Sequence, residues 1–161
     1  AVRRAGRLGD GYITDAAPLE EVRPALELLD EGAREAGKDP HAMGLALLQN
    51  VSVRREGDAW EIARPGVIHQ LGAYTAWDEG DDTPDRDELA PRAGDEDALR
   101  RSTIAGTPDE VAHALRPIVA AFADRDLHLV VRLHYPGMDF DTASSAVEAF
   151  GEEVLPALKG A

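Results

Sequence analysis

Apolar segments of two kinds alternate along this chain, and this alternation most restricts its fold. Residues 44–53 and 127–133 are nearly continuous apolar runs, typical of strands covered on both faces, and residues 12–14 form a shorter run. Segments with apolar residues three and four apart, typical of amphipathic helices, occupy residues 1–8, 18–36, 58–79, 107–122 and 141–158. Strands separated by helical crossovers cannot pair as hairpins, so the sequence predicts an α/β fold with parallel strands alternating with helices.

Local signals refine the helix boundaries. Thr107, Pro108 and Glu110 form a capping-box pattern that predicts a helix start, with Pro108 at the first helical position. Pro65 and Gly66 interrupt the segment 58–79, and we expect them to divide it into two helical pieces.

Charge excludes several classes of partner. The 161 residues contain 31 Asp and Glu against 17 Lys and Arg, a formal net charge of −14. Such a surface repels nucleic-acid phosphates and anionic membranes, so we expect neither as a partner. No apolar run approaches the ~18 residues of a membrane span, and no signal peptide is visible. We therefore expect a cytoplasmic protein.

More than half of the charge excess lies in one stretch. Residues 78–97 hold ten Asp and Glu and two Arg, with few apolar side chains. This composition predicts a mobile acidic loop over residues 78–101, either solubilising the chain or closing over a site. The acids lack the spacing of a calcium-binding loop, and the chain has no Cys, so no metal site is expected.

The number of strands is too small for a closed structure. Three strands, or four at most, are visible, whereas a TIM barrel has eight and typically ~250 residues. The chain begins at Ala1 rather than Met, so we expect a processed or trimmed protein, or one that lacks an upstream part. Residues 1–161 are then one partial barrel domain, two copies that complete each other, or a reduced open sheet. Exposed strand edges favour self-association in each case.

Five segments occur in a recognisable order: RRAGRLGDGYI, ALELLDEGAREAGKDP, GTPDEVAHALRPIV, HLVVRLHYPGM and FGEEVLPAL. Together they resemble the C-terminal half of the bacterial luciferase-like flavin-dependent monooxygenases. The resemblance implies a (β/α)8 TIM barrel, of which this chain would hold the last three strands, with a flavin at the C-terminal mouth. It also implies an oxidoreductase that acts on a small organic substrate, either as an FMN-dependent monooxygenase using O2 or by hydride transfer with a deazaflavin coenzyme.

The resemblance also leaves an alternative open. The family's glycine-rich phosphate turn and its N-terminal strands have no counterpart in these residues. The chain could therefore need an N-terminal half as its partner. It could equally be a truncated, non-catalytic relative that holds no cofactor and binds a ligand or another chain.

Arg132 and His134 are the predicted catalytic residues. They alternate on one face where the last strand ends, and barrels place their sites at that end. Arg132 could bind a phosphate or a substrate anion, and His134 could move protons near neutral pH. The alternative is an arginine–carboxylate pair that closes the barrel rim.

Two further groups are predicted to bind the cofactor. His69, Tyr74 and Trp77 share one helix and could form an aromatic wall beside a flavin or substrate, although such stripes also pack cores. Gln49 and Asn50 lie near the end of the strand 44–53, where neutral amides could hydrogen-bond a flavin edge. Ordinary loop capping is the alternative for these two amides.

Overall fold

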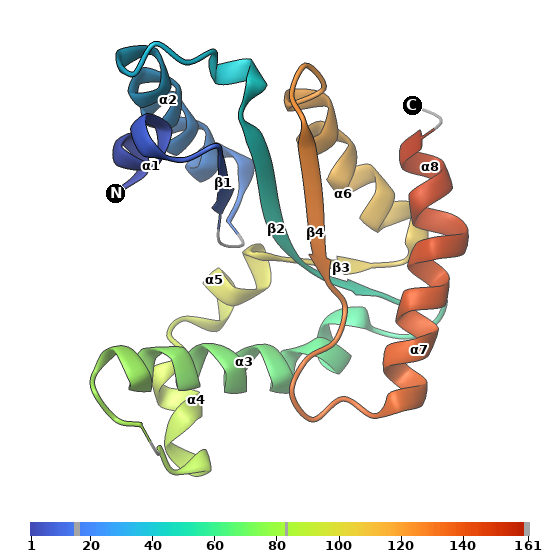
Figure 1. Ribbon diagram of the computed structural model, residues 1–161. Helices are drawn as coiled ribbons and strands as arrows, with labels where there is room; N and C mark the ends of the chain where they lie inside the picture. Colours follow the sequence, from blue (N-terminus) through green and yellow to red (C-terminus); the bar gives the residue numbers. More distant parts are fainter. Residues whose placement is uncertain (15–16, 83, 160–161) are drawn as a thin grey trace. The chain divides into compact units, whose positions relative to one another are not determined.

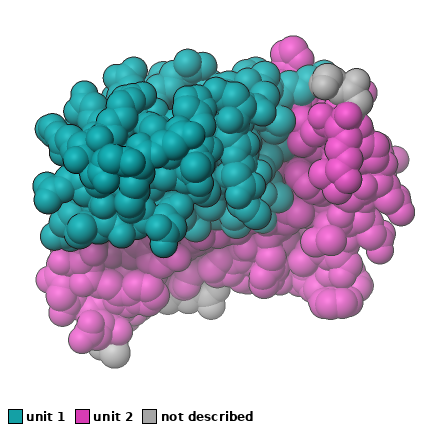
Figure 2. Space-filling model, turned by 45° about the horizontal axis from the view of Figure 1, so that its top comes forward, with its two compact units in different colours: residues 1–49, 114–131 teal, residues 50–113, 132–161 magenta. Residues whose placement is uncertain are grey.

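The computed structural model describes residues 1–14, 17–82 and 84–159, and it confirms an α/β chain. Its elements, in chain order, are α1 (Val2–Leu8), β1 (Gly11–Thr14), α2 (Leu19–Glu35), η1 (Pro40–Ala42), β2 (Gly44–Val53), α3 (Ala59–Asp78), η2 (Arg86–Glu88), α4 (Leu89–Arg92), α5 (Glu96–Arg101), β3 (Thr103–Gly106), α6 (Pro108–Ala121), β4 (Leu127–Arg132), α7 (Phe140–Ala149), the π-helical η3 (Phe150–Val154) and α8 (Leu155–Lys159) (Figure 1). They form two compact units: unit 1 comprises residues 1–49 and 114–131, and unit 2 comprises residues 50–113 and 132–161 (Figure 2).

In unit 1, β2 lies between β1 and β4. β1 pairs in parallel with residues 44–47 of β2, and β4 also pairs with β2 (Figure 1). The amide of Gly44 donates to the carbonyl of Asp10, and the next amide, that of Leu45, donates to the carbonyl of Asp126. Successive amides of a strand point to opposite edges, so β1 and β4 lie on opposite edges of β2. The three strands predicted from the sequence are therefore neighbours in chain order.

Two glycines bring α1 and α2 into backbone contact. A Cβ atom on Gly6 would lie 2.1 Å from the carbonyl oxygen of Leu29, and one on Gly32 would lie 2.0 Å from that of Arg3. Only glycine allows helices to approach this closely. The sequence predicts an apolar stripe on α2, of which Val22, Leu26, Leu29 and Ala33 are buried. The fifth predicted member, Ala36, is exposed because it follows the last residue of the helix.

A short strand in unit 2 was missed by the sequence analysis. β3 pairs in parallel with β2, from Thr103 opposite Asn50 to Gly106 opposite Val53. Its four residues, TIAG, are too few to show an apolar pattern. The capping box that follows is confirmed, because the Thr107 amide donates to Glu110 Oε2 at 2.8 Å and the Glu110 amide to Thr107 Oγ1 at 3.4 Å.

The predicted division of the segment 58–79 is wrong. α3 is one 20-residue helix with Pro65 inside it, and it starts where the Asp58 carboxylate accepts hydrogen bonds from two backbone amides. Gly66 serves packing rather than a break. A Cβ atom there would lie 2.5 Å from Tyr135 Cβ and 2.8 Å from the carbonyl oxygen of Pro136.

The acidic stretch contains helical segments that pack on α3. Leu89 of α4 and Leu99 of α5 are buried, and a Cβ atom on Gly72 of α3 would lie 2.0 Å from the carbonyl oxygen of Leu89. Leu99 joins the main cluster of buried apolar residues in unit 2, which is made of Trp60, Ala63, Val67, Ala93, Leu99 and Tyr135. The mobility of residues 78–101 and the single partial barrel domain stay predictions.

The C-terminal helix is continuous over its described length. α7, η3 and α8 follow one another from Phe140 to Lys159 without a gap, in agreement with the predicted helix 141–158 (Figure 1). None of the described helices is both long and apolar enough to cross a membrane.

Candidate functional site

Six of the seven predicted site residues belong to unit 2, and five of them line one pocket. The pocket has a volume of about 360 Å³ and is called the Arg132 pocket below. Its lining consists of His69, Gln70, Ala73, Tyr74, Trp77, Arg132, His134 and Pro136. The two groups that the sequence suggested separately, one on a helix and one at a strand end, therefore meet in space.

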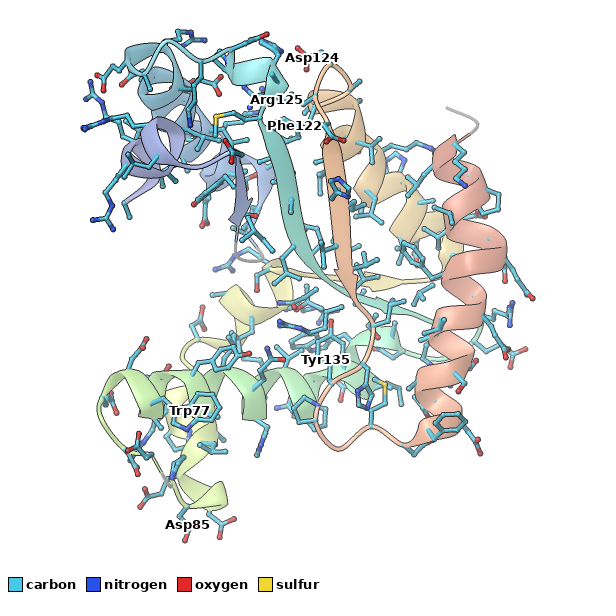
Figure 3. All side chains as sticks on the ribbon, in the orientation of Figure 1. Trp77, Asp85, Phe122, Asp124, Arg125 and Tyr135 are labelled. Carbon is cyan, nitrogen blue, oxygen red and sulfur yellow. The ribbon has the colours of Figure 1, made fainter. Side chains whose placement is uncertain are left out.

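The α3 side of this pocket is an aromatic wall. The rings of Tyr74 and Trp77 lie 5.6 Å apart between centroids at 46°, and the two side chains are 44% and 52% exposed. Gln70, which the sequence analysis missed, donates from Nε2 to the Tyr74 hydroxyl at 3.1 Å. Its spacing of four residues from Tyr74 was a signal that could have identified it. Trp77 and Tyr135 are labelled in Figure 3.

The other side of the pocket begins where β4 ends. Arg132 is the last residue of β4, and its Nη1 donates to Asn50 Oδ1 at 3.1 Å. Asn50, the sixth predicted residue in unit 2, therefore orients Arg132 without lining the pocket. The contacts of the described residues give Arg132 no carboxylate partner, so its charge is not neutralised by an ion pair there.

Tyr135 anchors this strand end. Its buried hydroxyl lies 3.1 Å from the carbonyl oxygen of Val51 and 3.3 Å from that of Arg132, and it donates to them. Burial raises the pKa of Tyr135 well above its usual value, although the nearby Arg132 charge and the hydrogen bond to Val51 oppose this shift. Tyr135 therefore stays protonated and acts as a fixed structural donor.

Gln49 belongs to unit 1. It is buried, and its Nε2 donates to the carbonyl oxygen of Ala17 at 3.3 Å. The amide of Asn50 likewise has a partner within the chain, Arg132. The prediction that these two amides hydrogen-bond a flavin edge stays a prediction, and both already serve internal contacts.

Two further pockets differ from the Arg132 pocket in the charged residues that line them. One, in unit 2, has a volume of about 470 Å³, and its lining includes Asp58, Glu110 and Arg100. The other, in unit 1, has a volume of about 250 Å³, and its lining includes Glu27, Asp30, Asp124 and Arg125. The lining of the Arg132 pocket contains one arginine, two histidines and no carboxylate.

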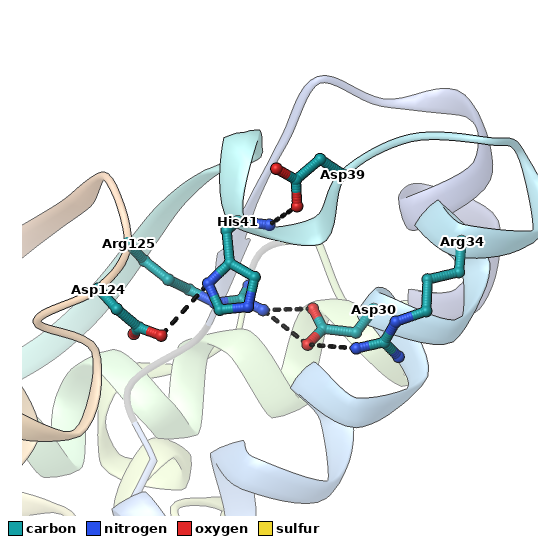
Figure 4. A network of polar contacts seen from close by, with 6 residues as sticks. All are labelled: Asp30, Arg34, Asp39, His41, Asp124 and Arg125. Atoms are coloured by element: carbon teal, nitrogen blue, oxygen red, sulfur yellow. Dashed lines mark hydrogen bonds and ion pairs between the residues drawn. The ribbon is translucent and has the colours of Figure 1, made fainter.

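The lining of the pocket in unit 1 includes residues from two separate groups of polar contacts (Figure 4). Arg125 Nη2 donates to both carboxylate oxygens of Asp30, at 2.5 and 2.6 Å, and Arg34 lies 3.9 Å from the same carboxylate. His41 Nδ1 lies 3.2 Å from Asp124 Oδ2. Over the described part of the chain, no cluster of three or more His, Cys, Asp or Glu has the geometry to hold a metal ion.

Three known proteins are similar to this chain over nearly its whole length. A 5,10-methylenetetrahydromethanopterin reductase of Methanopyrus kandleri is 25% identical over 98% of this chain and 48% of its own length. The structure of an F420-dependent secondary alcohol dehydrogenase matches with a TM-score of 0.66 at 23% identity, covering 98% of this chain and 45% of that one. The oxygenating constituent of 3,6-diketocamphane monooxygenase from Pseudomonas putida, in complex with FMN, matches with a TM-score of 0.59 at 18% identity, over 98% and 45%.

The same matches show how much of each relative this chain covers. The chain spans about half the length of the relatives that it matches. Their fold confirms the predicted class, part of a TIM barrel with parallel strands alternating with helices. The sequence model of the luciferase-like monooxygenases matches residues 1–125. The chain therefore belongs to the luciferase-like monooxygenase family.

Proposed function

We propose that this chain is part of a flavin-type oxidoreductase and supplies the substrate side of its active site. The Arg132 pocket carries this proposal. It begins where the last predicted barrel strand ends, and TIM-barrel enzymes place their active sites at the C-terminal ends of the strands. Family membership supports redox chemistry on a small organic substrate.

Two cofactors are compatible with the relatives. Their names include F420, a deazaflavin, and FMN, so we propose either hydride transfer with a deazaflavin or monooxygenation with FMN and O2. Within the described residues, Gln49 Nε2 and Asn50 Oδ1 already have partners, and the chain spans about half the length of its relatives. We therefore assign most flavin contacts to the part of the barrel that this chain does not span.

Within the chain, we propose three roles at the Arg132 pocket. Arg132 binds an anionic group of the substrate through its guanidinium fork. His134, which lines the pocket two residues further on, transfers a proton to or from the bound molecule. Tyr74 and Trp77, together with His69, form the wall that orients the molecule and excludes water from one side.

The barrel would be completed by other strands. In the described residues of unit 1, the outer edges of β1 and β4 pair with no further strand. Each strand also carries an exposed apolar side chain, Ile13 on β1 and Val130 on β4. Unpaired edges and exposed apolar groups favour association with a complementary half barrel or a second copy. The mass in solution tests this, since a stable monomer of 17.3 kDa would contradict it.

Isolation of the native complex tests the proposed oxidoreductase. A tag at the C-terminus would allow purification from the cells that produce the chain, followed by release of bound cofactor and its identification by mass. We expect FMN or a deazaflavin at close to one equivalent. A complex without either cofactor would contradict the proposal and favour the alternative, a non-catalytic module that binds a ligand or partner.

A further inference from the structure

Charge distinguishes the Arg132 pocket from the rest of this acidic chain. The sequence has 31 Asp and Glu, and both other pockets described above include carboxylates in their linings. The lining of the Arg132 pocket has none, and it includes Arg132, His69 and His134. A pocket that is locally cationic in a protein of net charge −14 concentrates anions of small size at that point.

The partner of Arg132 keeps this charge available. The guanidinium is oriented by the neutral amide oxygen of Asn50 at 3.1 Å, rather than by a carboxylate. A neutral acceptor restricts the orientation of the side chain without cancelling its charge. The planar donor array of arginine matches a carboxylate in a two-point contact, which a lysine could not reproduce.

The opposite wall selects for a flat ring. Tyr74 and Trp77 are roughly half exposed although they are large aromatic side chains, and they are held together by ring contact. Gln70 fixes the Tyr74 hydroxyl. Ala73 and Pro136 supply small apolar contacts in the same lining. Aromatic rings stack favourably on such a surface in offset or tilted geometry.

We propose that the Arg132 pocket binds a small aromatic acid. The ring packs against Tyr74 and Trp77, and the acidic group binds the guanidinium of Arg132. Since this acid would be the organic substrate, the inference rests on the proposed function and narrows its substrate class. The pocket volume of about 360 Å³ accommodates a molecule of one or two rings.

Binding of fluorinated probes tests the proposal without any cofactor. 4-Fluorobenzoate and 4-fluorobenzamide have nearly the same shape and differ in charge, and ¹⁹F NMR measures the affinity of each for the purified chain. We expect the benzoate to bind about tenfold more tightly or better, since a hydrogen bond to a charged group contributes more than a neutral one. Cyclohexanecarboxylate, which lacks the aromatic face, should compete poorly.

Two substitutions measure separately what the Arg132 charge and the aromatic wall contribute to probe binding. Arg132→Gln should reduce benzoate binding to the level of benzamide, and Trp77→Leu should weaken both probes by a similar factor. The matched controls are Arg100→Gln, an exposed arginine that lines the other pocket of unit 2, and Phe140→Leu, an aromatic side chain that is 81% exposed. Both controls should leave the two affinities unchanged. If Arg132→Gln fails to fold by circular dichroism, Arg132→Lys replaces it, with an intermediate benzoate affinity expected.

Three results would overturn the inference: equal affinity for the two probes, a benzoate preference that Arg132→Gln leaves undiminished (or, where Arg132→Lys replaces it, a benzoate affinity equal to that of the wild-type protein), or displacement of 4-fluorobenzoate by FMN. The last result would make the pocket part of the flavin site. These outcomes are independent of the proposed function, because a native complex can contain flavin without a benzoate preference. Conversely, the preference can persist in a chain whose complex contains no flavin.

Discussion

Two arginines near the two ends of β4 differ in the partners that the structure gives them. Arg125, just before the strand, belongs to unit 1, and its side chain is 7% exposed and bonded to both oxygens of Asp30. Arg132, the last residue of the strand, belongs to unit 2, bonds a neutral amide and lines a pocket. The charge of Arg125 is neutralised by the Asp30 carboxylate, whereas Arg132 has no carboxylate partner among the described residues.

The different partners of the two arginines agree with a general rule for barrel strands. The N-terminal ends of barrel strands serve stability and the C-terminal ends serve the active site. Under the proposed function, the two arginines would therefore take opposite roles, according to the partner that the fold provides. At the beginning of β4 the partner is Asp30 of α2, and at its end the partner is Asn50 of β2.

The largest expected effect comes from breaking the first pair. Arg125→Met leaves the partly buried carboxylate of Asp30 without its bidentate partner, so we expect a loss of about 3 kcal/mol in the free energy of unfolding. Urea unfolding measures it. The double variant Arg125→Met with Asp30→Leu should recover most of this loss, because Arg125 Nη1 is buried without a hydrogen-bond partner among the described residues.

Arg132→Met is the matched control at the other end of β4. Its removal leaves only a neutral amide oxygen without a partner, so we expect a loss of about 1 kcal/mol. Similar losses for the two arginines would contradict the division into a structural and a ligand-binding charge.

Much of this scaffold was predictable from the sequence, for identifiable reasons. The strands 44–53 and 127–133 are long apolar runs, and most of the predicted stripe of α2 is buried, because burial of apolar surface dominates both patterns. β3 was not predicted because a run of four residues is too short to carry a periodic signal. The continuity of α3 through Pro65 was also missed, because tertiary packing against Gly66 outweighs the local preference for a break.

The candidate site shows a similar limit. The sequence identified Arg132, His134, His69, Tyr74 and Trp77 as two groups, each from its position along one element. Their meeting in one pocket depends on Tyr135 and Pro136 lying against Gly66, which is a contact between segments distant in sequence. No spacing rule encodes such a contact, so only the structure could join the groups.

Packing at the C-terminal end of β4 gives the next prediction. Gly66→Ala places a methyl group 2.5 Å from Tyr135 Cβ, so we expect a loss of about 1–3 kcal/mol in unfolding free energy, as for other overpacked sites. Weaker 4-fluorobenzoate binding should accompany it. Gly151→Ala is the control, since its methyl group would meet nothing within 4 Å, and alanine should stabilise that helix by up to about 1 kcal/mol. Equal effects of the two substitutions would argue against this packing.

The Tyr135 hydroxyl contributes a smaller and pH-dependent term. Tyr135→Phe removes the donor to the carbonyl of Val51, so we expect a loss of about 1 kcal/mol at neutral pH. Burial raises the folded-state pKa of Tyr135 above its unfolded value of 10.0, so its stabilising contribution is complete below pH 10 and is lost as pH rises further.

Urea unfolding of both proteins at pH 8 and near pH 11 tests this dependence. The wild-type protein should lose up to about 1.4 kcal/mol per pH unit above pH 10 relative to Tyr135→Phe, so the gap between the two proteins should narrow. A constant gap across this range would show that the phenol is not held in its neutral form.

The last test gives Arg132 a carboxylate partner like the one that Arg125 has. Asn50→Asp keeps the size of the side chain but gives Arg132 a carboxylate, as Asp30 does for Arg125. Neutralising the guanidinium should lower the affinity for 4-fluorobenzoate about fivefold, equivalent to about 1 kcal/mol, and leave 4-fluorobenzamide unaffected. Asn50→Ala, which frees the guanidinium without neutralising it, should cost less than half as much in binding energy. If Asn50→Asp binds the benzoate as tightly as the wild-type protein, the neutral partner of Arg132 has no role in anion binding, and the contrast between the two arginines reduces to their burial.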